Sequence, residues 1–257
     1  MLTPPEIARS LLAAGESKAR LPFGKMLLLA ILAGAYIALA GVGATAAAVT
    51  VESGSLAKLL SACVFPAGLS MVILAGSELF TGNCLMVMAL LERRITPAQL
   101  LRNWLTVYLG NAVGGAAVAA LAVYSHTASL FGDGLARSMV SIAESKAALG
   151  FGDAFLRGVL CNSLVCLAVW MAAASKRAEG KVIALFFPIL LFVLCGYEHC
   201  IANLYYLPAG AFAAAEYGME TTLTLAGCLK NLAAVTLGNL VGGAALGVGY
   251  RFAYLKE

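Results

Sequence analysis

The chain has 257 residues, of which 61% are hydrophobic and only 12% charged, and its formal net charge is +4. A soluble domain of this size and composition would expose a large unpaired apolar surface, so the sequence indicates a membrane protein. Basic residues in so apolar a chain act as topological markers, and no nucleic-acid partner is expected. The seven cysteines lie in apolar runs without the close Cys/His spacing of a metal or haem site. We expect reduced packing cysteines, no metal and no cofactor.

The N-terminal segment, residues 1–24, lacks the apolar core and the small-residue cleavage site of a signal peptide. Thr3 is followed by two prolines and Glu6, which is typical of a helix start. We therefore expect an amphipathic helix over residues 6–20 that lies on the membrane surface.

Three membrane crossings are expected in the first half of the chain. Residues 26–51 carry no charge and are long enough to cross a hydrocarbon core of about 30 Å. Between positions 58 and 92 the only charged residue is Glu78, and one straight helix over this stretch would be roughly 50 Å long. We expect a helix broken near Gly76, followed by a third crossing within residues 103–132.

The second half begins with a polar connection near residues 126–156, in which solvated side chains are expected. A fourth crossing is predicted over residues 158–175. The stretch 181–216 repeats the overlong apolar run, interrupted after Gly196, and residues 231–250 supply a sixth crossing. The connection contains His126, Asp133, Arg137, Glu144 and Lys146.

An internal repeat relates the two halves. The residues from Gly76 to Asn83 and from Gly196 to Asn203 both have the pattern G-x-E-x-x-x-x-N. The tripeptide Leu-Gly-Asn ending at Asn111 recurs at Asn239, and each copy belongs to a G-x-x-x-G spacing that predicts close helix contact. The two spacings are Gly110 with Gly114 and Gly238 with Gly242.

Three crossings per repeat is an odd number, so the second repeat enters the membrane from the opposite side. We predict a single all-α transmembrane domain, residues 1–257, of six helices in two inverted three-helix repeats, 25–125 and 153–252. The second and fifth helices are broken. Of the 17 Lys and Arg residues, twelve fall on the side of the N-terminus and five on the other, which favours cytoplasmic N- and C-termini.

Two broken helices would turn unpaired N–H groups and the positive ends of helix dipoles toward the membrane midplane, where they attract anions. Glu78 and Glu198 stand where the second half-helices begin, and we expect their carboxylates to cap those N–H groups as structural acids. A proton-carrying role is the alternative.

His199 and Thr81 differ between the two copies. An imidazole inside a span can change charge and donate to an anion, and the alternative is a histidine satisfied by a neighbouring helix. A hydroxyl at Thr81 can bond an anion or a water, or bond back to its own helix. No H-E-x-x-H motif and no nucleophile placed with a base occur, so an enzyme is not expected.

Four apolar residues near the breaks could form rings on either side of His199, although ordinary core packing explains such residues on pattern alone. They are Phe65, Leu69, Phe80 and Phe192.

These motifs resemble those of the formate/nitrite transporter family, which includes formate, nitrite and hydrosulfide channels, over about residues 3–252. The resemblance rests on both G-x-E segments, on Asn162 with residues 165–171, and on the block from Arg102 to Asn111. It implies an aquaporin-like protomer of six spans with its own pore, assembled as a homopentamer in the plasma (inner) membrane.

The resemblance also implies site roles. His199 would be the central pore histidine, Thr81 its hydroxyl partner, and Asn162 part of the same neighbourhood. Lys146 resembles the basic residue that draws anions toward the outer mouth. The constriction positions would be Phe65, Leu69, Phe80 and Phe192. Cys200 follows the histidine where family members often have Ser, and Cys84 follows Asn83; neither difference translates into a selectivity.

The expected function is a channel or proton-coupled transporter for small monovalent anions of weak acids, with the anion protonated near His199. Formate and nitrite come first, then hydrosulfide, with acetate and lactate as further candidates; the partners are then protons and the lipid bilayer. The alternatives are a passive anion pore, an anion-binding sensor or scaffold, and an intramembrane enzyme. A water or glycerol channel is disfavoured because the repeated Asn-Pro-Ala signature is absent.

Overall fold

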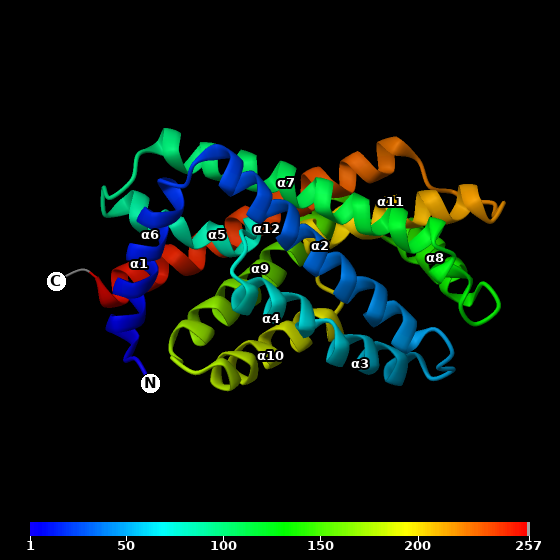
Figure 1. Ribbon diagram of the computed structural model, residues 1–257, viewed down its shortest axis with the longest axis horizontal. Coiled ribbons are helices and arrows are strands. Elements are labelled where there is room, and N and C mark those ends of the chain that lie inside the picture. Colours follow the sequence, from blue (N-terminus) through cyan, green and yellow to red (C-terminus); the bar gives the residue numbers. More distant parts are fainter. Residues whose placement is uncertain (256–257) are drawn as a thin grey trace.

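The computed structural model describes residues 1–255, and all regular elements in this range are helical. The α-helices are α1 Pro4–Ala19, α2 Phe23–Ala48, α3 Gly54–Val64, α4 Pro66–Ala75, α5 Phe80–Asn83, α6 Val87–Leu91, α7 Pro97–Tyr124, α8 Gly134–Ala148, α9 Phe151–Ala173, α10 Ala178–Leu194, α11 Cys200–Glu216 and α12 Leu225–Tyr254; the 3₁₀ helices are η1 Cys84–Met86 and η2 Thr127–Ser129. The start of α1 and the end of α12 lie at one end of the molecule, and α8 lies toward the other (Figure 1).

Five helical stretches among the described residues are long and apolar enough to cross a membrane: α2, α3 with α4, α7, α9 and α12. The remaining apolar stretch of the second half is divided into α10 and α11, each of 17 residues. A gap of five residues separates these two helices, just as four residues separate α4 from α5. The chain is therefore a bundle of apolar helices with two non-helical interruptions.

The helix pairs α2 with α7 and α9 with α12 form the most extensive contacts of the bundle. A Cβ on Gly114 would lie 2.8 Å from Ala35 N, and one on Gly242 would lie 2.9 Å from the Val159 carbonyl carbon, both closer than packed atoms allow. The close helix contact predicted from the two G-x-x-x-G spacings is confirmed. These contacts pack α7 against α2 in the first half of the chain and α12 against α9 in the second half.

The structure differs from the sequence predictions in two places. The third crossing begins earlier and ends earlier than residues 103–132, because Thr96 forms a capping box with Gln99 before Pro97, and His126 takes a left-handed conformation after Tyr124. The predicted polar connection instead contains the 15-residue helix α8. This helix packs on α11 and has a buried apolar face.

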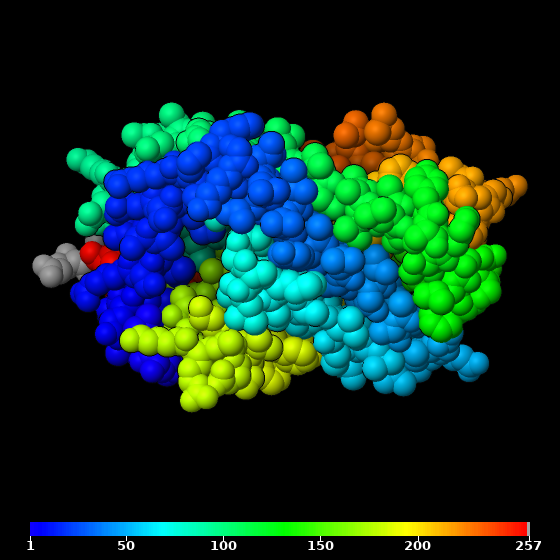
Figure 2. Space-filling view, viewed as in Figure 1, coloured from blue at the N-terminus to red at the C-terminus, as the bar shows by residue number. Residues whose placement is uncertain are grey.

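The N-terminal helix α1 packs its apolar face on the protein, and its position at a membrane surface stays a prediction. Ile7, Ala8, Gly15 and Ala19 are buried against α6, α9, α12 and neighbouring segments. Leu2 N donates to Ala174 O at 2.9 Å, which ties the start of α1 to the end of α9. Figure 2 shows α1 beside α4 and α10, with a hollow between them.

Candidate functional site

The two interruptions have the same backbone construction. Gly76 and Gly196 follow α4 and α10 with φ of 76° and 69°, a left-handed conformation that glycine adopts without steric cost. Two residues later, Glu78 N donates to Leu29 O on α2 at 3.2 Å, and Glu198 N donates to Arg157 O on α9 at 3.3 Å. Each interruption is therefore held by the helix that packs beside it.

An asparagine side chain bridges each interruption. Asn111 of α7 accepts from Phe80 N at 3.0 Å and donates to Glu78 O and Ala30 O at 2.9 and 2.7 Å. Asn111 and its counterpart Asn239 are both fully buried, and each uses its side-chain carbonyl oxygen and its amide N–H groups together. These bonds satisfy backbone groups that a helix interruption leaves without partners.

The second asparagine repeats these bonds. Asn239 of α12 accepts from Cys200 N at 2.9 Å and donates to Glu198 O and Gly158 O at 2.9 and 2.8 Å. The sequence repeat contains both asparagines, and their recurrence is the sequence signal for this structural role.

The prediction that Glu78 and Glu198 cap the half-helix N–H groups was wrong. Glu78 accepts from Lys18 Nζ at 2.8 Å and from Asn83 Nδ2 at 2.7 Å. Glu198 accepts from Lys146 Nζ at 2.9 Å and from Asn203 Nδ2 at 2.7 Å. Each glutamate lies one residue before the helix N-cap, and a nearby ammonium forms the stronger charge-assisted bond.

His199 is itself the N-cap of α11. Its Nδ1 accepts from Ala202 N at 3.0 Å, so this nitrogen carries no proton, and the neutral ring has its proton on Nε2. Nε2 lies 3.0 Å from Thr81 Oγ1 and donates to it. The imidazole and the hydroxyl come from different halves of the chain and are both buried.

Asn162 of α9 lies beside Thr81 but contacts its backbone, not its hydroxyl. Asn162 Nδ2 donates to Thr81 O at 3.2 Å and to Asn239 O at 2.7 Å. Cys166, one turn later on α9, also donates to Thr81 O, with Sγ at 3.3 Å. The position of Thr81 is thereby fixed by α9.

A cavity of about 720 Å³ that is lined largely by α3 and α8, and that we name the outer cavity, ends on the aromatic residues next to the imidazole. His199, Phe192 and Phe65 all line it. The Phe192 ring stacks on His199 with centroids 5.8 Å apart, and the Phe65 ring meets Phe192 edge-on at 5.7 Å. Of the four predicted constriction residues, Phe192 therefore lies directly beside the histidine, and Phe65 lies next to Phe192 on the same cavity.

A second cavity of about 410 Å³, which we name the inner cavity, lies between α1, α4, α9 and α10. Leu69 of α4 lines it, together with Glu78 and Gly82, the residue after Thr81. Phe80 lines neither cavity; its ring packs edge-on against Tyr108 and Trp104, with centroids 5.1 and 6.4 Å away. Leu69 thus lines the inner cavity, whereas Phe65 lines the outer one.

Lys146 is not a solvated residue of an outside connection, as its place in the sequence suggested. It lies near the end of α8, its side chain is 15% exposed, and it is paired with Glu198. Its ammonium also lies 5.3 Å from the centre of the Tyr206 ring. Lys18 makes the matching pair with Glu78, a contact that no local pattern could reveal because 60 positions separate the two residues.

The described residues contain no group of three His, Cys, Asp or Glu side chains that could hold a metal ion. The site is instead an uncharged imidazole–hydroxyl pair with aromatic and aliphatic neighbours. Such a site can donate a hydrogen bond to a small polar solute in an apolar surrounding.

The sequence model of the formate/nitrite transporter family matches residues 5–253 of this chain. The chain belongs to the formate/nitrite transporter family. Membership in this family of membrane transporters, together with its apolar helical stretches, makes the protein a multi-pass membrane protein and not an enzyme.

Similar proteins agree with this assignment. A probable formate transporter of Methanothermobacter thermautotrophicus is 38% identical over 275 residues, which cover 99% of this chain and 98% of the relative. A solved FNT family ion channel superposes with a TM-score of 0.86 at 32% identity, covering 96% of this chain and 98% of that one. A pentameric formate channel with formate bound superposes with a TM-score of 0.81 at 33% identity, covering 91% and 98%.

Proposed function

We propose that this family member is a channel or proton-coupled transporter for small monovalent anions of weak acids, with formate as the first substrate. The observation that carries the proposal is the buried pair of His199 and Thr81 between an outer cavity ending at Phe65 and an inner cavity reached by Leu69. The similar structure with formate bound supports the choice of substrate. Nitrite, hydrosulfide, acetate and lactate are tested beside formate.

The proposed architecture is a protomer that crosses the membrane six times in two inverted repeats, with both termini in the cytoplasm. The recurring bonds of Asn111 and Asn239 support the repeat, and the similar pentameric structure supports a homopentamer in the plasma membrane. The outer cavity then opens to the outside and the inner cavity to the cytoplasm.

The proposed passage depends on the cost of placing an anion between apolar side chains. Protonation removes most of that cost, which is several kcal/mol for an ion in an apolar medium. Formate takes a proton from or through Nε2 of His199, and formic acid passes Phe65 and Leu69 before it releases the proton. The proton that Nε2 gives up is replaced by one that Nδ1 takes from solvent, which keeps the imidazole neutral, so the bond that Ala202 N donates to Nδ1 must open.

A passive anion pore is the second candidate, and one observation favours it. Because Nδ1 is already occupied by the Ala202 N–H, the histidine can keep its Nε2 proton throughout and act only as a dipole. Electrical recordings separate the two: formate currents without accompanying proton movement indicate the pore.

The proposal is tested by stopped-flow uptake into liposomes at several pH values, with formate, nitrite, hydrosulfide, acetate and lactate compared. His199→Asn is expected to slow formate uptake and to change its pH dependence. His126→Asn is the matched control, because the only other histidine of the chain is exposed and lies outside the helices α7 and α8. Native uptake with native pH dependence in His199→Asn would overturn the role of the histidine. Vesicles impermeable to every weak acid would indicate a sensor or scaffold.

A further inference from the structure

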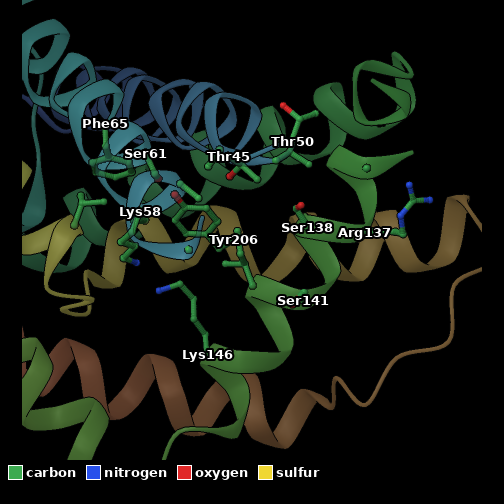
Figure 3. A pocket seen from close by; sticks show the side chains of 18 of the residues that line it. Thr45, Thr50, Lys58, Ser61, Phe65, Arg137, Ser138, Ser141, Lys146 and Tyr206 are labelled. Atoms are coloured by element: carbon green, nitrogen blue, oxygen red, sulfur yellow. The ribbon is translucent and has the colours of Figure 1, made fainter. Parts of the chain in front are cut away.

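Lys58 of α3 reaches the same outer cavity as Lys146. Both residues line this cavity, and their side chains point toward one another across it (Figure 3). Ser61 and the C-cap residue of α3, Phe65, line it as well, and the spacing of three and four residues places these side chains and Lys58 on one helix face. Lys58 therefore stands two turns from Phe65, about 10 Å along the helix axis.

The charge of Lys146 is already offset. Its ammonium lies 2.9 Å from Glu198 Oε1, and this carboxylate is buried. A close ion pair acts at a distance as a dipole, whose field falls off faster than that of a single charge. Lys146 thus contributes little to attracting an anion from the mouth of the cavity.

Lys58, in contrast, has no carboxylate oxygen of residues 1–255 within 4.0 Å. Arg137 is the other cation on this cavity, but it is solvent-exposed, donates to Gly132 O and points away from the lysines (Figure 3). Lys58, Lys146 and Glu198 together leave one net positive charge, and Lys58 is the one of the two lysines that has no carboxylate contact.

The inner cavity has the same arrangement. Lys18 is paired there with Glu78 at 2.8 Å, and Lys181 of α10 lines the cavity without a carboxylate partner within 4.0 Å among the described residues. The repeat offset of 120 between Gly76 and Gly196 maps Lys58 onto Ala178, one helical turn before Lys181. Each half of the chain thus places a second lysine on the same face of the helix before its interruption.

We propose that Lys58 and Lys181, and not the paired lysines, draw the anion into the two cavities. The inference rests on the proposed anion transport. A single charge on a cavity with low-dielectric walls focuses field lines and raises the local concentration of a counter-ion. The Lys–Glu pairs then serve to hold the interruptions in place, and the two unpaired lysines set how often an anion arrives.

The test measures formate permeability of proteoliposomes at low formate concentration. Lys58→Gln and Lys181→Gln are each expected to lower it about three- to tenfold, with Lys58→Arg and Lys181→Arg close to the wild type. The matched controls are Lys230→Gln and Lys25→Gln, which remove the same charge from exposed residues that line neither cavity.

Salt dependence separates attraction from a structural role. Potassium gluconate raised from about 0.01 M to about 1 M shortens the Debye length from roughly 30 to 3 Å and should lower wild-type permeability, while the Gln variants respond less. Wild-type permeability or wild-type salt response in both Gln variants would overturn this inference alone. Wild-type vesicles that pass no weak-acid anion would overturn the proposed function and this inference with it.

Discussion

Thr81 Oγ1 and His199 Nε2 lie 3.0 Å apart, although 118 positions separate the two residues along the chain. The contact joins the second residue of α5 to the N-cap residue of α11, and both helices begin after equivalent interruptions. Because the two copies are otherwise built alike, the difference between a hydroxyl in one and an imidazole in the other gives the centre its chemistry.

Removal of the Thr81 hydroxyl should leave the Nε2–H of His199 without an acceptor. Thr81→Val is expected to destabilise the protein by about 1–3 kcal/mol, the usual cost of a buried unsatisfied donor, and to slow formate uptake. Thr81→Ser keeps the hydroxyl and should behave nearly as the wild type. Thermal unfolding in detergent and the liposome assay measure the two effects. Equal behaviour of Thr81→Val and Thr81→Ser would contradict the hydrogen bond.

The pair of Lys18 and Glu78 should show coupling. Glu78→Gln leaves the ammonium of Lys18 half-buried without its counter-ion, so we expect a loss of about 1–3 kcal/mol. Adding Lys18→Met removes the stranded charge, and the double variant should be more stable than Glu78→Gln alone. Apparent melting temperatures of the four proteins form the double-mutant cycle. Strictly additive effects would mean that the pair contributes no coupling energy.

Gly114 should tolerate no side chain, since a Cβ would press against the backbone of Ile31 and Ala35. Gly114→Ala is expected to destabilise the α2–α7 packing by about 1–3 kcal/mol, as overpacking of a tight interface does. Gly249→Ala in α12 is the matched control, because no atom lies within 4 Å of its Cβ position and alanine favours a helix. Comparable yields and melting temperatures for both variants would contradict the close contact.

A pH effect on stability is expected from Glu144, which lies outside the membrane-spanning helices. The Thr222 N–H and the Thr221 and Thr222 hydroxyls donate to its carboxylate and lower its pKa below the ordinary 4.5. The charged form is thus favoured in the folded state. Its stabilisation is present above the unfolded-state pKa and is lost as the pH falls through the lowered pKa.

Glu144→Gln should therefore melt at a lower temperature than the wild type at neutral pH and approach it below pH 4.5. Glu220→Gln is the control, because it removes the same charge from an exposed residue that directly precedes Thr221 in the sequence. A constant difference between Glu144→Gln and the wild type from neutral to acidic pH would contradict the assignment. Melting curves over this pH range are the measurement.

Local signals were enough for several features. The apolar composition indicated the membrane, and the G-x-x-x-G spacings predicted the close contacts of α7 and α12, because a missing side chain is a property of one residue. The family followed from motifs spread over most of the chain, and the family model confirms it. The start of the third crossing could not be predicted from the uncharged run alone, because a capping box at Thr96 begins the helix before that run.

The tertiary structure decided which polar groups meet. The sequence repeat indicated Glu78 and Glu198 as candidate structural acids. Their partners, Lys18 and Lys146, lie 60 and 52 positions away along the chain. The physical reason is that a buried carboxylate takes the strongest donor within reach, and reach is a matter of packing and not of spacing along the chain. The same packing leaves Lys58 unpaired in the outer cavity, so the free charge at that mouth became visible only in the folded chain.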